Sequence, residues 1–197
     1  MHNNKGFTLW FTGLPCSGKT TVADGVAKKL KGMGLKVERL DGDIVRQSLT
    51  KDLGFSKEDR DKNIERVTFV AKLLSRNGIA VLVSFVSPYR EKRRKARDET
   101  TNFVEVYVKC PTEECQRRDT KGMYKKALAG EIENFTGVSD PYEEPENPEI
   151  ILETDKETSR ESIDNVIEKL KELSLISKDN KDGKEKIKER LKSLGYL

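Results

Sequence analysis

The feature that most constrains this chain is the stretch 13–20, which reads GLPCSGKT and fits the pattern G-x-x-x-x-G-K-[ST]. An apolar run over 7–12 precedes it, and apolar residues recur at three- and four-residue spacing over 22–30, as on one face of a helix. Strand, glycine-bounded loop and helix are the context that a phosphate-binding loop requires. Backbone N–H groups of such a loop point at phosphate oxygens, and the positive helix end adds a favourable field. The pattern predicts that the chain binds a nucleoside triphosphate.

Each residue of this loop is expected to contact the nucleotide. Lys19 can reach the β and γ phosphates, and the Thr20 hydroxyl can ligate Mg²⁺. Cys16 is most simply a filler, because only its backbone is needed, although a thiol beside phosphate is also a candidate for redox sensitivity. The expected nucleotide-binding residues are Gly13, Leu14, Pro15, Cys16, Ser17, Gly18, Lys19 and Thr20.

Length and composition narrow the class of protein further. The 197 residues suffice for one α/β domain with a substantial core. A formal net charge of +4 gives no global field that favours nucleic acid or a membrane surface. The single histidine and three cysteines, without zinc-like spacing, argue against a histidine-based triad or a zinc site. No apolar run is long enough to span a bilayer, and residues 1–6 contain no signal-peptide core, so a cytoplasmic location is expected.

Apolar runs alternate with amphipathic stretches along the chain. A helix over 56–76 has a capping start, and another is expected to begin at Ser87-Pro88 with Ser87 as its N-cap. This alternation predicts a three-layer α/β sandwich of the phosphate-loop kinase type, with about five parallel strands and helices on both faces. The domain is expected to span 1–174, followed over 175–197 by a polar linker and a short amphipathic helix. The strands are expected at 7–12, 36–40, 79–85, 103–108 and 149–153.

Acidic residues follow the second expected strand rather than the run 79–86. Ligands of such sheets lie beyond the carboxyl ends of the strands, so Asp41, Asp43 and Ser87 are expected near the phosphate loop. A phosphoryl-transfer enzyme needs such carboxylates, together with cations over the moving phosphate. The basic stretch 117–126 is interpreted as a lid that closes over the phosphates, with the solvated face of a helix as the alternative.

Seven blocks of sequence, in order, resemble the adenylylsulfate (APS) kinases. This resemblance implies transfer of the γ-phosphoryl group of ATP, with Mg²⁺, to the 3′-hydroxyl of adenosine 5′-phosphosulfate (APS), giving 3′-phosphoadenosine 5′-phosphosulfate (PAPS) and ADP. It also implies a homodimer and an association with ATP sulfurylase. The matching blocks are 40–46, 52–56, 59–64, 86–90, 118–127, 134–137 and 141–148.

The resemblance also implies roles for individual residues. Asp43 is the implied acceptor of the 3′-hydroxyl proton, and Lys19 and Ser87, the family's phosphoserine position, join it as candidate catalytic residues. Arg118 is implied as an ATP contact, and Thr20, with Asp41 as a further candidate, as a metal ligand. The implied APS contacts are Asp41, Asp43, Arg46, Phe55, Arg60, Asn63, Val86, Ser87, Lys121 and Phe135.

Several alternatives stay open at this stage. The chain could be a kinase of another nucleotide or small alcohol, or a regulatory subunit that binds ATP and APS without turnover. Ser87 is also explained as an ordinary helix cap. Phe55 and Phe135 lie in loop-like sequence, which favours stacking on an adenine over burial in the core.

Overall fold

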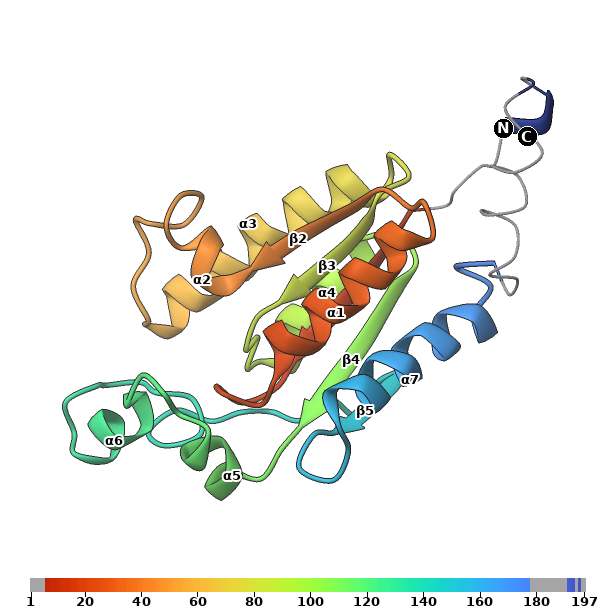
Figure 1. Ribbon diagram of the computed structural model, residues 1–197. Helices are drawn as coiled ribbons and strands as arrows, with labels where there is room; N and C mark the ends of the chain where they lie inside the picture. The colour runs from red at the N-terminus through yellow and green to blue at the C-terminus, as the bar shows by residue number, and fades with distance from the viewer. Residues whose placement is uncertain (1–5, 178–190, 194, 196–197) are drawn as a thin grey trace.

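The computed structural model describes residues 6–177, 191–193 and 195 of the chain. Its strands are β1 (Phe7–Thr12), β2 (Val37–Asp41), β3 (Ala80–Ser84), β4 (Phe103–Lys109) and β5 (Ile150–Glu153). They form one sheet in the order β2-β3-β1-β4-β5, and each neighbouring pair is parallel (Figure 1). The chain leaves β1 at the centre of the sheet, where successive connections change direction. Such a point is where α/β sheets place their ligands.

Helices connect the strands and cover both faces of the sheet. The helices are α1 (Lys19–Gly32), α2 (Gly42–Val45), α3 (Lys57–Ser75), α4 (Arg90–Glu99), α5 (Thr112–Arg117), α6 (Met123–Leu128) and α7 (Ser159–Glu172). Successive side chains of a strand point to opposite faces of the sheet. Leu9 and Phe11 therefore face α1 and α7, whereas Trp10 faces α3 and α4. The predicted three-layer sandwich with a five-stranded parallel sheet is confirmed.

Two short helices lie apart from these layers. In Figure 1, α5 and α6 lie beyond the end of β4, on the same side of the sheet as the start of α1. A small core of their own, which includes Cys115 and Tyr124, packs against Leu14 and Cys16 of the phosphate loop. The basic stretch predicted as a lid therefore lies next to the loop.

The helix expected to have Ser87 as its N-cap begins two residues later. Arg90 is the first residue of α4, and Tyr89 precedes it as the N-cap without a side-chain cap. Ser87 has a positive φ of 45° and is almost fully buried, and its hydroxyl accepts a hydrogen bond from Trp10 Nε1 at 3.0 Å. The prediction that Ser87 caps this helix is wrong, because a long-range hydrogen bond occupies its hydroxyl.

The packed part of the chain continues past residue 174. Ile176 is buried against the core formed by α1 and α7, and Leu175 packs beside it. Most of the predicted linker and helix, 178–190 with 194 and 196–197, lies outside the described residues, whereas 191–193 are helical. Within the described part of the chain, no helix is both long and apolar enough to cross a membrane.

A buried arginine joins α4 to the sheet and to the loop before β5. Arg93 donates to Glu105 Oε1 at 2.7 Å, to the carbonyl of Ser87 at 2.5 Å and to the carbonyl of Glu143 at 2.6 Å. Its side chain is 2% exposed. A buried guanidinium with three acceptors fixes the backbone at the carboxyl end of β3.

We predict that Arg93→Met destabilises the fold by about 3 kcal/mol, because it leaves the largely buried Glu105 carboxylate without its main partner. Urea unfolding followed by circular dichroism measures this change. The matched control is Arg94→Met, on the exposed side of the same helix, which should change stability by no more than about 0.5 kcal/mol. Equal effects of the two substitutions would contradict the assignment.

Candidate active site

The phosphate loop connects β1 to α1 through a turn that only glycine can form. A Cβ on Gly13 would lie 2.4 Å from the carbonyl oxygen of Val108, so any side chain there would collide with the backbone of β4. Gly18 has φ of 97° and precedes the first turn of α1. The Ser17 hydroxyl is buried and has no hydrogen-bond partner among the described residues. The loop thus offers an unpaired polar group and a helix N-terminus to an anion.

Lys19 folds back into the curl of this loop. Its Nζ donates to the carbonyl of Gly13 at 3.1 Å and to that of Leu14 at 2.7 Å. Burial lowers the pKa of Lys19 to about 8. An anion in the loop would favour the protonated ammonium, so this lysine is suited to bind phosphate.

The carboxylate of Asp41 is the junction between α1, β2 and β3. It accepts hydrogen bonds from Thr20 Oγ1 and Ser84 Oγ, both at 2.8 Å, and from the backbone N–H of Asp43 at 3.0 Å. Burial acts to raise the pKa of Asp41. The hydrogen bonds from Ser84 and Thr20 outweigh it, so this pKa lies below its usual value. Asp41 is therefore an ionised oxygen ligand beside the phosphate loop.

This pair of oxygen donors suits Mg²⁺, which is commonly held by one or two carboxylates together with substrate phosphates and water. Thr20 and Asp41 supply one hydroxyl and one carboxylate next to the place where phosphates would lie. Among residues 6–177, 191–193 and 195, no group of three or more His, Cys, Asp and Glu side chains forms an all-protein metal site. The donor set fits a metal that arrives with the nucleotide.

Asp43 and Lys121 meet across the site. The Lys121 ammonium lies 2.6 Å from Asp43 Oδ2, and both side chains are mainly exposed. The hydrogen bond to Asp43 raises the pKa of Lys121. A cation from the 117–126 segment and a carboxylate from α2 therefore face the same solvent-filled space.

Arg118 is tied to the phosphate loop through one intermediary. It donates to Glu114 at 2.6 Å and to the hydroxyl and carbonyl of Thr154 at 3.1 and 2.7 Å. The Thr154 hydroxyl in turn donates to the carbonyl of Ser17 at 2.9 Å. The Arg118 guanidinium thus lies beside the phosphate loop, where a contact with ATP was expected.

Several of the residues expected to contact APS form a second group, which contacts of two arginines hold together. Arg60 bonds to the carbonyl of Phe55 at 2.9 Å, to Thr136 Oγ1 at 2.5 Å and to the carbonyl of Asn134. The Arg46 guanidinium lies 4.3 Å from the centre of the Phe55 ring. Arg60 was expected to grip the phosphosulfate, but in this structure it joins the two loops that carry the expected aromatic residues.

The two phenylalanines differ in exposure. The ring of Phe55 is exposed, at 57% of its surface, whereas Phe135 is only 8% exposed. Phe135 packs edge-on against Tyr124, with ring centroids 5.0 Å apart. In this structure the 123–128 helix covers Phe135, so of the two rings only Phe55 is open to solvent.

The remaining expected site residues lie at the carboxyl end of β3 or on α3. Asn63 is buried on α3, and its Oδ1 has no partner among the described residues. The carbonyl of Val86 accepts a hydrogen bond from Thr12 Oγ1 at 2.7 Å, beside the buried Ser87. The unpaired Oδ1 of Asn63 needs a donor, whereas its NH₂ group is the part of the amide that can donate to an anion.

The cysteines have structural surroundings. Cys110 and Cys115 are buried in the small core of α5 and α6. Burial, followed by the charge of Asp119, raises the pKa of the Cys16 thiol. Reactive cysteines have lowered pKa values, so this environment favours the filler interpretation.

Residues that the sequence did not single out complete the site. Ser84 holds Asp41, Thr154 links Arg118 to Ser17, and Tyr124 covers Phe135. Ser84 is the last residue of the apolar strand β3, and a polar residue at the carboxyl end of such a strand could have been predicted as a site residue. Thr154 and Tyr124 gave no local signal, because their partners in the phosphate loop, Ser17 and Pro15, lie more than 100 residues away along the chain.

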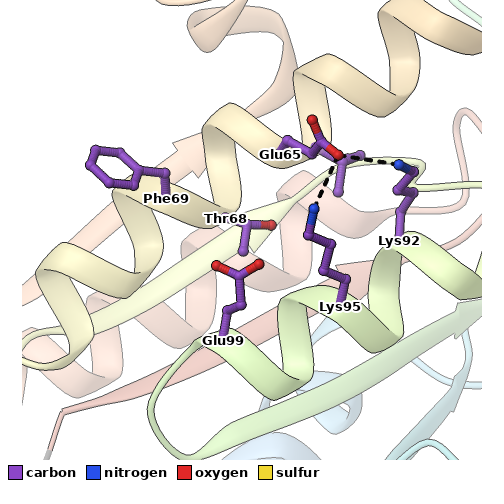
Figure 2. A pocket seen from close by; sticks show the side chains of 7 residues that line it. Glu65, Thr68, Phe69, Lys92, Lys95 and Glu99 are labelled. Atoms are coloured by element: carbon purple, nitrogen blue, oxygen red, sulfur yellow. Dashed lines mark hydrogen bonds and ion pairs between the residues drawn. The ribbon is translucent and has the colours of Figure 1, made fainter.

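A cavity between α3 and α4 lies apart from this site. Figure 2 shows Glu65 bonded to Lys92 and Lys95 across it, with Phe69 and Glu99 along its wall. None of the expected site residues lines it. The candidate active site is therefore identified by the polar side chains that meet beside the phosphate loop, and not by this cavity.

Comparisons with known proteins agree with this geometry. The chain is 64% identical over 167 residues to a probable adenylyl-sulfate kinase of Pseudomonas aeruginosa, covering 85% of this chain and 78% of that protein. It is 60% identical over 177 residues to the adenylyl-sulfate kinase of Halothermothrix orenii, covering 90% and 96%. The solved structure of the Mycobacterium tuberculosis APS kinase in complex with AMPPNP and APS superposes with a TM-score of 0.81 at 45% identity. That match covers 85% of this chain and 98% of the other.

The family described as adenylylsulphate kinase matches residues 5–153, which include the phosphate loop, Asp41, Asp43 and the 117–126 segment. The match covers well over half of the chain. The sequence, the fold and the arrangement of the site lead to the same conclusion: this chain belongs to the adenylylsulphate kinase family.

Proposed function

We propose that this chain transfers the γ-phosphoryl group of ATP to the 3′-hydroxyl of APS, giving PAPS and ADP. One observation carries the proposal: Asp43 forms an ion pair with Lys121 of the 117–126 segment. Two residues before Asp43, Asp41 accepts a hydrogen bond from Thr20 of the phosphate loop. A carboxylate for an acceptor hydroxyl, a cation and a nucleotide loop therefore converge. The chain's relatives of the same family, one of them solved with AMPPNP and APS, support the choice of substrates.

On the donor side, the backbone of 13–20 holds the phosphates of ATP, and Lys19 neutralises the β and γ groups. Thr20 and Asp41 would hold Mg²⁺, which screens the phosphate charge when bound. Arg118 lies over the same region and is assigned to ATP. Because phosphoryl transfer has a loose transition state, positioning and charge neutralisation supply most of the catalysis.

On the acceptor side, Phe55 and Phe135 are assigned to the adenine of APS. Arg46, Arg60 and Asn63 are assigned to its phosphosulfate. For Arg60 this requires exchange of a protein acceptor for the ligand, since its present bonds join two loops. Asp41, Val86 and Lys121 complete the substrate contacts.

Asp43 orients the 3′-hydroxyl and accepts its proton as the new P–O bond forms, while the bond from the γ phosphorus to the bridging oxygen of ADP breaks. Direct transfer between two bound nucleotides needs no phosphoenzyme. Ser87 is buried with its hydroxyl bonded to Trp10, and we assign it a structural place beside the substrate.

Further proposals concern the assembly of the chain, which the resemblance implies, and its location. We propose that the chain forms a homodimer that can associate with ATP sulfurylase, and that it works in the cytoplasm. The runner-up functions are a kinase of another alcohol and a regulatory subunit without turnover. The presence of Lys19, Thr20 and Asp43 favours turnover.

The direct test is ADP release from ATP and Mg²⁺ with APS, compared with adenosine and AMP as acceptors. The proposal expects strong dependence on APS and a product phosphorylated at the 3′ position. Tight binding of both nucleotides without turnover would instead establish the regulatory function. Turnover with another alcohol but not APS would refute the acceptor assignment.

We predict that Asp43→Asn lowers kcat by about 100-fold, the lower end for loss of a general base, while the affinity for ATP stays nearly unchanged. Steady-state kinetics and calorimetric ATP binding separate the two quantities. Asp98→Asn, an exposed carboxylate on α4, serves as the matched control with unchanged kcat. Parallel losses in kcat and ATP affinity would remove Asp43 from the catalytic role.

Phe55→Ala should raise the KM for APS by roughly tenfold or more, the value of one base–aromatic stack, and spare the KM for ATP. Initial-rate measurements with each substrate varied in turn test this. The control is Phe69→Ala, an equally exposed ring on α3 that lines the cavity away from the site. A higher KM for ATP with an unchanged KM for APS would place Phe55 on the donor side.

The affinity for ATP should fall as the pH rises through about 8. The Lys19 pKa is lowered to about 8 in the free protein, and bound phosphate raises it, so binding above pH 8 takes up a proton. Above that pH the association constant should fall by up to about tenfold per pH unit. Calorimetry from pH 7 to 9.5 measures how the association constant for ATP changes with pH. Lys19→Met should bind ATP weakly, and its association constant should not show this fall above pH 8. An association constant independent of pH would contradict the assignment.

A further inference from the structure

Tyr124 lies at the contact between the donor and acceptor halves of the proposed site. It belongs to α6, on the lid side, and is 1% exposed. Its two ends touch different halves of the site.

The phenol end of Tyr124 reaches the phosphate loop. Its Oη donates a hydrogen bond to the carbonyl of Pro15 at 3.1 Å. Next to this bond, Leu14 packs so closely on the 135–140 turn that a Cβ on Gly137 would lie 2.8 Å from Leu14 Cδ2. The phosphate loop therefore has two direct contacts with the lid and the turn.

The ring of Tyr124 reaches the acceptor half. It meets Phe135 edge to face, with centroids 5.0 Å apart and an interplanar angle of 74°. Thr136, the next residue, accepts a hydrogen bond from Arg60. Both Phe135 and Arg60 are assigned to APS, so the Tyr124 ring packs directly on the acceptor site.

We propose that Tyr124 is a positioning residue that couples occupancy of the phosphate loop to the placement of Phe135 against APS. The inference rests on the proposed function. Buried side chains are close-packed, so a shift of the Pro15 carbonyl on nucleotide binding moves the ring that contacts Phe135. ATP binding thereby raises the affinity for APS, and APS raises the affinity for ATP by the same factor.

The test measures the dissociation constant of APS with and without AMPPNP and Mg²⁺ by calorimetry. Tyr124→Phe keeps the ring contact and removes only the hydrogen bond to Pro15. In the parent protein AMPPNP should tighten APS binding by roughly three- to tenfold, the worth of one such bond, and in Tyr124→Phe this ratio should fall close to one. Ser162→Ala removes a buried hydroxyl of α7 that donates a hydrogen bond to Glu157, and it should keep the parent ratio.

A merely structural Tyr124 would weaken APS binding equally in both conditions, and an unchanged ratio in Tyr124→Phe overturns the inference. A parent ratio of one overturns it as well. If Tyr124→Phe does not fold, Leu14→Ala removes the second contact and must lower the same ratio. Absence of APS binding in every condition refutes the proposed function, whereas APS turnover with an unaltered ratio refutes the coupling alone.

Discussion

The carboxylate of Asp41 holds the catalytic edge of this protein together. It receives the Thr20 hydroxyl from the start of α1 and the Ser84 hydroxyl from the end of β3, while standing itself at the end of β2. A buried carboxylate without partners would be costly, and these hydrogen bonds hold the three elements to one another. The backbone N–H of Asp43 donates to the same carboxylate, which fixes the start of α2 beside it.

The two halves of the site are built differently. The donor half stands on the sheet edge, where the parallel strands and the glycine turn at Gly13 leave little freedom. The acceptor half consists of loops held to one another by arginines, Arg60 between two of them and Arg93 behind Ser87. A donor site built on the sheet and a second site built from joined loops suit an enzyme that must bring two nucleotides together and exclude water.

Local patterns were enough to predict the sheet, the phosphate loop and the carboxylates after β2. These features depend on periodicity and on glycine geometry, which the sequence expresses over a few residues. Ser87 was misplaced because its serine–proline pattern favours a helix cap, whereas its hydroxyl accepts a hydrogen bond from Trp10, 77 residues earlier in the chain. The burial of Phe135 was not predicted, because its loop-like surroundings do not reveal that Tyr124 of α6 covers it. Tertiary contacts decide the parts of the site that the sequence leaves open.

We propose that the phosphoryl group passes directly from ATP to the acceptor hydroxyl, with Ser87 outside the reaction. The stereochemical course at phosphorus tests it most directly. ATP made chiral at the γ position with sulfur and oxygen isotopes is used with APS, and the configuration of the 3′-phosphoryl product is read by phosphorus NMR. One in-line displacement predicts inversion. Retention would require two displacements through a phosphorylated side chain and would contradict the account.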